Sequence, residues 1–382
     1  MSLSRFMEHA LYCPVYGYYE KEGDKIGRRG DYYTSVSAGS LFGELLACQF
    51  AEWFEQGPGI EKCQESGVEC HGSGHEKCRV GSGECGVENA EDGGAEEWGA
   101  ATVQLVEAGA HGGQLAKDIL GWMREWRGEV YGRLEYCIVE PSDRRREWQR
   151  RTLSDFLGKV RWVEEVPGVR CRAPCIIFAN ELLDAMPVHR LGWDAGQRAW
   201  FEWGITVEDG RFAWTRMSAP ACLLVGTSPL DAVLPDGFTR EVCPAAVDWW
   251  RQAASVLQCR KLVALDYGLT AEESLLPERP GGTLRAYSRH RVGTDVLLDP
   301  GEQDITAHVD FDAIQRAGEA AGLTTETFIT QSQFLTKIVE KILSGAVKFG
   351  EWTSERTRQF QTLTHPEHLG RAFRVLVQAR GG

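Results

Sequence analysis

The stretch VQLVEAGAHGGQL, residues 103–115, constrains the fold more than any other part of the chain. An apolar run with strand character ends on Glu107, and a glycine-bearing turn follows before a helix-like segment over 114–126. Such a turn lets the backbone approach a ligand closely and directs helix N–H groups toward it. It also allows tight packing of a strand against a helix. The spacing is not G-x-G-x-x-G and no lysine follows the turn, which disfavours dinucleotide and phosphate-loop sites.

Composition is that of a soluble globular protein. Hydrophobic residues make up 43% and charged residues 25% of the 382 residues, which is ordinary for folded domains. The net charge of −13 argues against a nucleic-acid partner, because no basic stripe is available for phosphates. No apolar run approaches membrane-spanning length, and the first residues show neither a signal-like nor an Arg-rich transit pattern. We therefore expect a cytoplasmic protein without membrane insertion, whose cysteines are reduced thiols.

Residues 57–100 differ from the rest of the chain. This segment holds eleven glycines, ten acidic and three basic side chains in 44 residues, and therefore carries a net charge of −7. It has almost no large apolar side chains to bury, so we predict a flexible insertion.

Zinc binding is the alternative for this insertion. The spacings C-x6-C and C-x7-C do not match the C-x2-C pattern of zinc knuckles, so we predict no metal site. The side chains that could ligate a metal are Cys63, Cys70, Cys78, Cys85, His71 and His75.

After residue 100 the chain alternates between strand-like and helix-like stretches, which predicts a mostly parallel sheet covered on both faces. The predicted strands are 102–107, 134–140, 160–164, 175–180, 261–266, 324–329 and 371–378, and the predicted helices are 114–126, 142–157, 244–257 and 310–321.

We therefore divide the chain into three parts. Residues 1–56 are predicted to form a helical cap, residues 57–100 the insertion, and residues 101–382 the core. Within the core, alternating residues over 187–217 around an Asp-Gly pair predict an inserted β-hairpin.

Ligands of open α/β sheets bind beyond the carboxyl ends of the strands. Polar side chains stand at several of the predicted ends, and Glu140, which ends the second strand, can accept both hydroxyls of a ribose. The alternative is that Glu140 is an ordinary solvent-exposed acid at the end of a strand, with no ligand. The other candidates at strand ends are Glu107, Asn180, Glu181, Asp184, Asp266 and Tyr267.

Together, these features describe a Rossmann-like class I methyltransferase. The pattern E-x-G-x-x-G-G resembles the first motif of enzymes that use S-adenosylmethionine (SAM). Acids close the first two of seven strands, and a polar cluster follows the fourth. A dehydrogenase would share the two acids and would lack the polar cluster.

A closer resemblance covers the whole chain except the insertion. The chain resembles the MidA family of SAM-dependent methyltransferases, which includes the mitochondrial complex I assembly methyltransferase. The colinear motifs are GYYE (17–20), IGRRGDYYTS (26–35), LFGELL (41–46), LVEAGAHGGQL (105–115), ANELLDAMPVHR (179–190), EVCPAA (241–246), LDYG (265–268), GGTLRAYSRH (281–290), DPGEQDITAHVDF (299–311) and HPEHLGRAFRVL (365–376).

This resemblance implies a cofactor site and a catalytic site. The turn at Gly109 and Gly113 would hold the methionine part of SAM with Glu107, and Glu140 would hold the ribose. The cap would close over them through Gly30, Asp31 and Thr34. The polar side chains that would face the transferred methyl group are Asn180, Glu181 and Asp184.

Simpler explanations exist for two of these groups. Gly30 and Asp31 would suit an ordinary turn, and Asn180 and Glu181 would suit the cap of a following helix.

The resemblance also implies a protein arginine as methyl acceptor and, by analogy, a respiratory-complex subunit as the protein that carries it. Because an arginine stays protonated, a carboxylate can orient it, and Glu181 is the first choice for this role. A small-molecule methyltransferase is one alternative. A SAM-binding assembly factor without catalysis is the other, because His111 stands where the family turn has its middle glycine.

We predict that the insertion is dispensable. Replacing residues 60–97 with a short Gly/Ser connector should leave the melting temperature and SAM affinity nearly unchanged, because loop length affects closure entropy only logarithmically. Thermal unfolding and calorimetric titration measure both quantities. Stoichiometric zinc together with loss of folding on deletion would instead establish a structural metal site.

Overall fold

The computed structural model describes residues 1–21, 34–56, 102–171, 174–224, 233–288, 291–367 and 369–381. The insertion at 57–100 and the predicted cap residues Gly30 and Asp31 lie outside these ranges.

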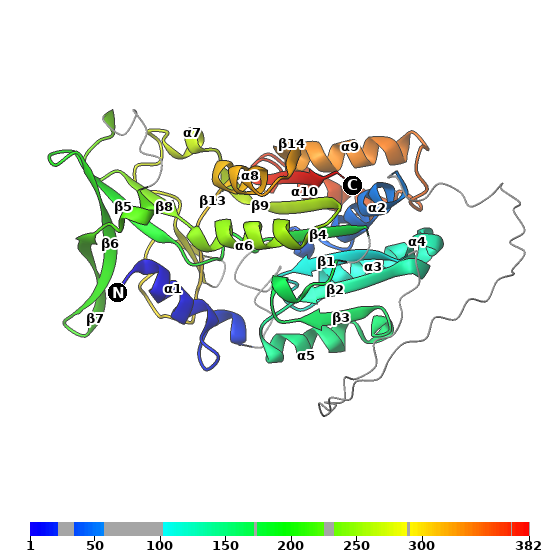
Figure 1. The fold of residues 1–382 in the computed structure, drawn as a ribbon, viewed down its shortest axis with the longest axis horizontal. Coiled ribbons are helices and arrows are strands. Elements are labelled where there is room, and N and C mark those ends of the chain that lie inside the picture. Colours follow the sequence, from blue (N-terminus) through cyan, green and yellow to red (C-terminus); the bar gives the residue numbers. More distant parts are fainter. Residues whose placement is uncertain are drawn as a thin grey trace, which may run out of the picture.

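A central sheet of mostly parallel strands forms the core, as predicted (Figure 1). All seven predicted strands are present, with ends shifted by at most three residues. They are β1 (Val103–Ala108), β2 (Leu134–Val139), β3 (Val160–Val163), β4 (Cys175–Asn180), β9 (Arg260–Leu269), β14 (Thr324–Thr330) and β15 (Phe373–Arg380). Their order is β14-β15-β9-β4-β1-β2-β3, and the short β13 (Val309–Asp310) pairs with β9.

The burial of the strands agrees with their parallel pairing. Strands β1, β2 and β4 are buried along all six residues, as expected for parallel strands covered on both faces. They pair in parallel with one another or with β3 and β9, whereas β15 runs antiparallel to both β9 and β14. The carboxyl ends of β1, β2 and β4 therefore meet at one edge of the sheet.

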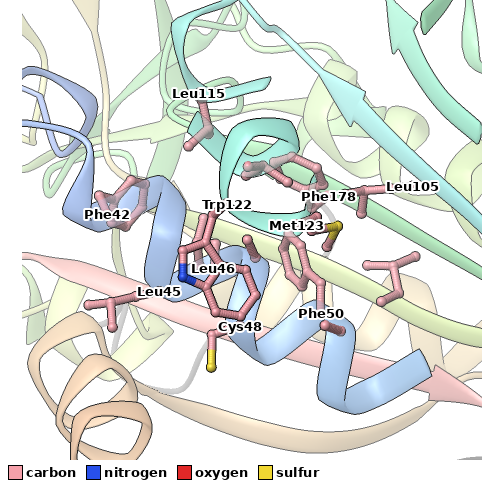
Figure 2. Packing of buried hydrophobic residues seen from close by; sticks show 14 of the residues in the cluster. Phe42, Leu45, Leu46, Cys48, Phe50, Leu105, Leu115, Trp122, Met123 and Phe178 are labelled. Atoms are coloured by element: carbon pink, nitrogen blue, oxygen red, sulfur yellow. The ribbon is translucent and has the colours of Figure 1, made fainter. Parts of the chain in front are cut away.

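Helices cover both faces of this sheet. Helices α2 (Leu41–Glu55), α3 (Gln114–Trp126) and α9 (Gln331–Leu343) contribute to the larger core on one face. Figure 2 shows Phe50 of α2 and Met123 of α3 packing near Phe178 of β4. Helices α6 (Pro244–Val256) and α8 (Phe311–Ala320) pack on the other face.

The remaining helices are short or lie at the periphery. None of the helices that the structure describes is long and apolar enough to cross a membrane. The α-helices are α1 (Leu3–Tyr12), α4 (Gly128–Arg133), α5 (Asp143–Thr152), α7 (Ala271–Ser274) and α10 (Ser354–Thr364), and the 3-10 helices are η1 (Tyr18–Glu20), η2 (Val36–Ala38), η3 (Ser154–Phe156), η4 (Val166–Gly168) and η5 (Ala221–Leu223).

The predicted hairpin is part of a four-stranded antiparallel sheet with the order β7-β6-β5-β8. Asp209 and Gly210 form its turn with φ values of 49° and 73°, the left-handed geometry that two-residue hairpin turns require. The strands are β5 (His189–Asp194), β6 (Ala199–Glu208), β7 (Arg211–Ser218) and β8 (Thr239–Val242), and a third sheet contains β10 (Arg285–Ser288), β11 (Arg291–Gly293) and β12 (Asp304–Thr306).

The N-terminal helices contact different parts of this architecture. Helix α1 packs on β5 and β6, whereas α2 packs on α3 over the central sheet. The segment between them reaches the carboxyl edge of the sheet through Thr34 and Ser37. The division of the chain at residues 56 and 100 stays a prediction.

A buried polar contact joins α6, α8 and β15. The indole Nε1 of Trp250 donates to Gln378 Oε1 at 2.8 Å, and Gln378 Nε2 donates to the carbonyl of Gln315 at 2.9 Å. Trp250 and Gln378 are fully buried. Gly318 of α8 faces this pair, because an added Cβ would lie 2.8 Å from Trp250 Nε1 and closer still to Gln378 Oε1.

We predict that Gly318→Ala lowers the free energy of unfolding by about 1–3 kcal/mol, the usual effect of overpacking a core. Gly121→Ala in α3 is the matched control, because nothing lies within 4 Å of an added Cβ there. That variant should be neutral or more stable by up to about 1 kcal/mol, from helix propensity. Denaturant unfolding measures both, and equal effects of the two substitutions would contradict the packing argument.

Candidate active site

A cleft of about 810 Å³ opens at the carboxyl ends of β1, β2 and β4. Its lining combines the glycine turn, the acids at the strand ends and aromatic side chains of the N-terminal segment. The lining residues used below are Tyr12, Tyr19, Thr34, Ser37, Glu107, Gly109, His111, Glu140, Arg145, Glu164, Glu165, Asn180 and Glu181.

The turn after β1 is left-handed at three positions. Gly109, His111 and Gly113 have φ values of 77°, 44° and 83°. Gly109 also has little space, because a Cβ there would lie 2.9 Å from Leu182 Cδ1. Histidine tolerates the left-handed region better than most residues, and Gln149 Nε2 donates to the carbonyl of His111 at 2.9 Å. The turn therefore accommodates His111 in place of the expected glycine.

Glu107 lies beneath this turn and is 2% exposed. The hydroxyl of Tyr136 donates to its Oε2 at 2.7 Å. Burial raises the pKa of Glu107 to about 7, although this hydrogen bond lowers it. Glu107 is thus a desolvated carboxyl group at the cleft, where the sequence predicted a cofactor contact.

Glu140 follows β2 and is 1% exposed. Its Oε1 accepts a hydrogen bond from Ser142 N at 3.0 Å and lies 2.9 Å from Arg145 Nη2. Its Oε2 accepts from Gln149 Nε2 at 3.1 Å. Burial raises the pKa of Glu140, and Arg145 and the two hydrogen bonds oppose that shift. The carboxylate is therefore held in one orientation at the cleft.

Asn180 and Glu181 lie together at the end of β4. Ser35 N donates to Glu181 Oε1 at 3.1 Å, and Asn180 Nδ2 approaches the same oxygen at 3.4 Å. Glu181 has a φ of 50°, an uncommon conformation that often marks functional sites. Burial and the nearby Asp266 raise the pKa of Glu181 to about 8. Asn180 is 8% exposed, and its Oδ1 is buried without a hydrogen-bond partner within the described part of the chain.

Asp184 lies behind these residues and is not part of the cleft lining. It hydrogen-bonds Asp266, and its pKa is raised far above the ordinary value by burial and by the neighbouring acids Asp266, Glu181 and Asp304. Asp266 is fully buried, and its Oδ2 accepts from the backbone N–H of Leu182 at 3.1 Å. Asp266 thus fixes the loop that carries the polar cluster.

Thr34 is the described member of the predicted cap contact. It is 4% exposed, and it exchanges hydrogen bonds with Ser37. Thr34 N donates to Ser37 Oγ at 2.9 Å, and Ser37 N donates to Thr34 Oγ1 at 3.0 Å. Both residues line the cleft, so the end of the cap segment does reach the predicted site.

Several cleft residues were not predicted from the sequence. Glu164 and Glu165 follow β3, so the rule that identified Glu140 could also have identified them. Arg145 stands five residues after Glu140 in a run of arginines, which gives a weaker signal. Tyr12 and Tyr19 had no local signal, because their positions depend on contacts with residues that are distant in the sequence.

The cleft suits SAM. Its volume falls within the range of roughly 300–1,000 Å³ that is usual for small-molecule sites. The left-handed turn exposes backbone groups, Glu140 offers acceptor oxygens, and Asn180 Oδ1 is a buried acceptor that lacks a partner among the described residues. These groups match a ligand with hydroxyl and ammonium donors and a positive sulfur.

Curated relatives cover nearly the whole chain. The chain is 24% identical over 421 residues to "Protein arginine methyltransferase NDUFAF7 homolog, mitochondrial" of Drosophila melanogaster, covering 99% of the chain and 81% of that protein. It is 27% identical over 423 residues to "Protein arginine methyltransferase NDUFAF7, mitochondrial" of Xenopus tropicalis, covering 100% and 83%. These names contradict the predicted cytoplasmic location and point to mitochondria. That prediction relied on missing targeting patterns, and such an absence does not determine a compartment.

A solved structure has the same fold. A protein from Burkholderia thailandensis, crystallised with S-adenosyl-homocysteine, superposes with a TM-score of 0.75 at 28% identity. The match covers 100% of the chain and 88% of that protein. The α/β fold and the cofactor class predicted from the sequence are thereby confirmed.

The family itself follows from the sequence match. Residues 91–329 match the family described as "Putative S-adenosyl-L-methionine-dependent methyltransferase". That match spans more than half of the chain, and it agrees with the MidA-type motifs, the strand order and the cleft. The chain belongs to this family of SAM-dependent methyltransferases.

Proposed function

We propose that this protein transfers a methyl group from SAM to a guanidinium nitrogen of an arginine in a protein substrate. The observation that carries the proposal is the pair formed at the cleft by the buried Asn180 and the half-buried Glu181. The names of the curated relatives, which are protein arginine methyltransferases, support it. By the MidA resemblance, a subunit of a respiratory complex is the proposed acceptor protein.

The proposal assigns the cofactor to the β1–β2 side of the cleft. Glu107 and the turn at Gly109 and Gly113 would hold the methionine part, and Glu140 would accept the ribose hydroxyls. Thr34 would close the site from the cap. Gly30 and Asp31 keep the same proposed role from the resemblance, outside the described residues.

Bound SAM supplies a methyl group on a positively charged sulfur. The residues of the chain would contribute mainly orientation, since in-line transfer depends on near-attack geometry. As the N–C bond forms and the S–C bond breaks, the nitrogen must lose a proton, which the ionised carboxylate of Glu181 would accept. Ser35 and Asn180 both direct their donors at Glu181 Oε1, which leaves Oε2 to accept an N–H of the guanidinium. Asn180 Oδ1 can accept a second N–H.

Electrostatics favour a cationic acceptor. In the ligand-free protein, burial and the neighbouring acid Asp266 raise the pKa of Glu181 to about 8. An adjacent guanidinium lowers the pKa of a carboxyl group, so acceptor binding would restore the ionised form. Asp184 would act from behind Glu181, outside the cleft lining, by holding Asp266 through their hydrogen bond.

We predict that Glu140→Ala weakens SAM binding by about 1.5–3 kcal/mol, the range for lost hydrogen bonds to a charged group. Calorimetric titration measures the affinity. Glu164→Ala is the matched control, because Glu164 also lines the cleft and its side chain is 75% exposed; its effect should stay below about 0.5 kcal/mol. Unchanged affinity in Glu140→Ala would remove Glu140 from the site.

We predict that Glu181→Gln lowers methyl transfer by about two orders of magnitude or more, as expected for loss of a positioned acid–base group. SAM affinity should change little, because the cofactor is held elsewhere. In the wild type, kcat/KM should rise as the pH increases through about 8, the pKa of Glu181, since the ionised carboxylate is the active form. The variant should lose this rise.

The assay follows radiolabelled methyl incorporation into proteins of the native host's lysate and then into a purified acceptor. Glu164→Gln serves as the control with unchanged activity. Near-wild-type transfer by Glu181→Gln would move the role to Asp184 or show that no carboxylate is needed. A wild type that binds SAM and labels nothing would favour the non-catalytic assembly factor.

A further inference from the structure

Arg145, in the first turn of α5, lies between two carboxylates from distant parts of the chain. Its Nη2 is 2.9 Å from Glu140 Oε1 and 3.7 Å from Glu20 Oε1. All three side chains are nearly buried, with exposed fractions of 11% for Arg145, 2% for Glu140 and 9% for Glu20. A buried charge of this kind is strongly coupled to its partners.

Ser142, the N-cap residue of α5, completes a closed ring with these groups. Its backbone N–H donates to Glu140 Oε1 at 3.0 Å, and its Oγ donates to Glu20 Oε2 at 2.7 Å. The same Oγ accepts from Arg145 N at 3.3 Å. The orientation of Glu140 is therefore tied to the position of Glu20.

Glu20 belongs to the N-terminal strap, defined here as residues 17–21, which crosses to the other side of the cleft. Tyr19, which lines the cleft, donates its hydroxyl to Asp304 Oδ1 at 2.6 Å. Lys21 Nζ donates to the carbonyl of Gly301 at 2.8 Å and pairs with Glu302. The strap thus links the end of β2 to the region around β12.

The groups around Glu140 have opposing effects on its pKa. Burial raises its pKa, Arg145 lowers it most among the stabilising groups, and Glu20 raises it again. Only the ionised form offers two full acceptor oxygens to a pair of hydroxyls. The remaining charged or titratable side chains of the cleft are Tyr12, Tyr19, Glu107, His111, Glu164, Glu165 and Glu181.

We propose that Arg145 is a positioning residue for cofactor binding, which holds Glu140 ionised and oriented and couples it through Glu20 to the position of the strap. This inference rests on the proposed contact between Glu140 and the ribose. In this proposal, α5 and the strap affect cofactor affinity indirectly, through Glu140. Neither contacts the reacting atoms.

The test measures SAM affinity of Arg145→Met by calorimetry from about pH 6 to about pH 9, in buffers of different ionisation enthalpy. Removing the cation raises the pKa of Glu140, so the variant should bind SAM at least about tenfold more weakly than the wild type near pH 6. This deficit should shrink as the pH rises and Glu140 ionises. Near pH 6 to 7 the variant should also release more protons on binding than the wild type.

Three further variants separate the effect of the Arg145 charge from a structural effect of the substitution. Arg145→Lys keeps the charge and should recover most of the affinity. Glu20→Gln removes a charge that raises the pKa of Glu140 and also weakens the hydrogen bond from Ser142 Oγ. Any loss of affinity in this variant should therefore come from the strap contact and should be similar at each pH, unlike that of Arg145→Met. Arg146→Met is the control, because Arg146 pairs with Asp143 at 2.6 Å and Glu164 at 3.5 Å; its affinity should match that of the wild type at each pH.

A loss that is equal at all pH values in Arg145→Met, with no rescue by lysine, would overturn the proposal and indicate a structural role only. Unchanged affinity in Arg145→Met would also overturn it. Failure of the underlying contact is distinguishable, because Glu140→Ala would then retain full affinity. If Arg145→Met does not fold, the contrast between Arg145→Lys and Glu20→Gln decides the question.

Discussion

Desolvation of carboxyl groups at one edge of the central sheet is the constraint on which the cleft depends. Glu107, Glu140 and Asp266 are each almost completely buried where a strand ends. A buried carboxylate is unfavourable unless donors surround it, and each of the three has its own: a tyrosine hydroxyl, an arginine with a helix N-cap, and backbone N–H groups. The turns and helix N-termini around the cleft supply many of these donors.

The two sides of the cleft differ in how their carboxyl groups are compensated. On the β2 side, Arg145 compensates Glu140 within the protein. On the β4 side, Asp266 lies close enough to raise the pKa of both Glu181 and Asp184. In the proposed function, a cation brought by the substrate would favour the ionised form of Glu181. The difference agrees with the proposed ribose contact on one side and the proposed guanidinium contact on the other.

Sequence patterns predicted the central sheet well, because long apolar runs such as 175–180 need burial on both faces and can form only interior strands. The strand-end rule likewise located Glu140 and Glu181 at the cleft. The pattern could not show that Asp184 turns away from the lining, since that depends on side-chain direction within an irregular loop. It also missed Tyr19, whose place follows from a contact with a strand formed nearly 300 residues later.

The left-handed turn at His111 also bears on how such a sequence can arise. The MidA pattern has glycine at this position, and glycine and histidine codons differ at two bases. A path of single-base changes therefore passes through either aspartate or arginine. Aspartate enters the left-handed region more readily than arginine, so the path through aspartate keeps the turn tolerable at every step. Backbone geometry can in this way favour one mutational route between glycine and histidine at this position.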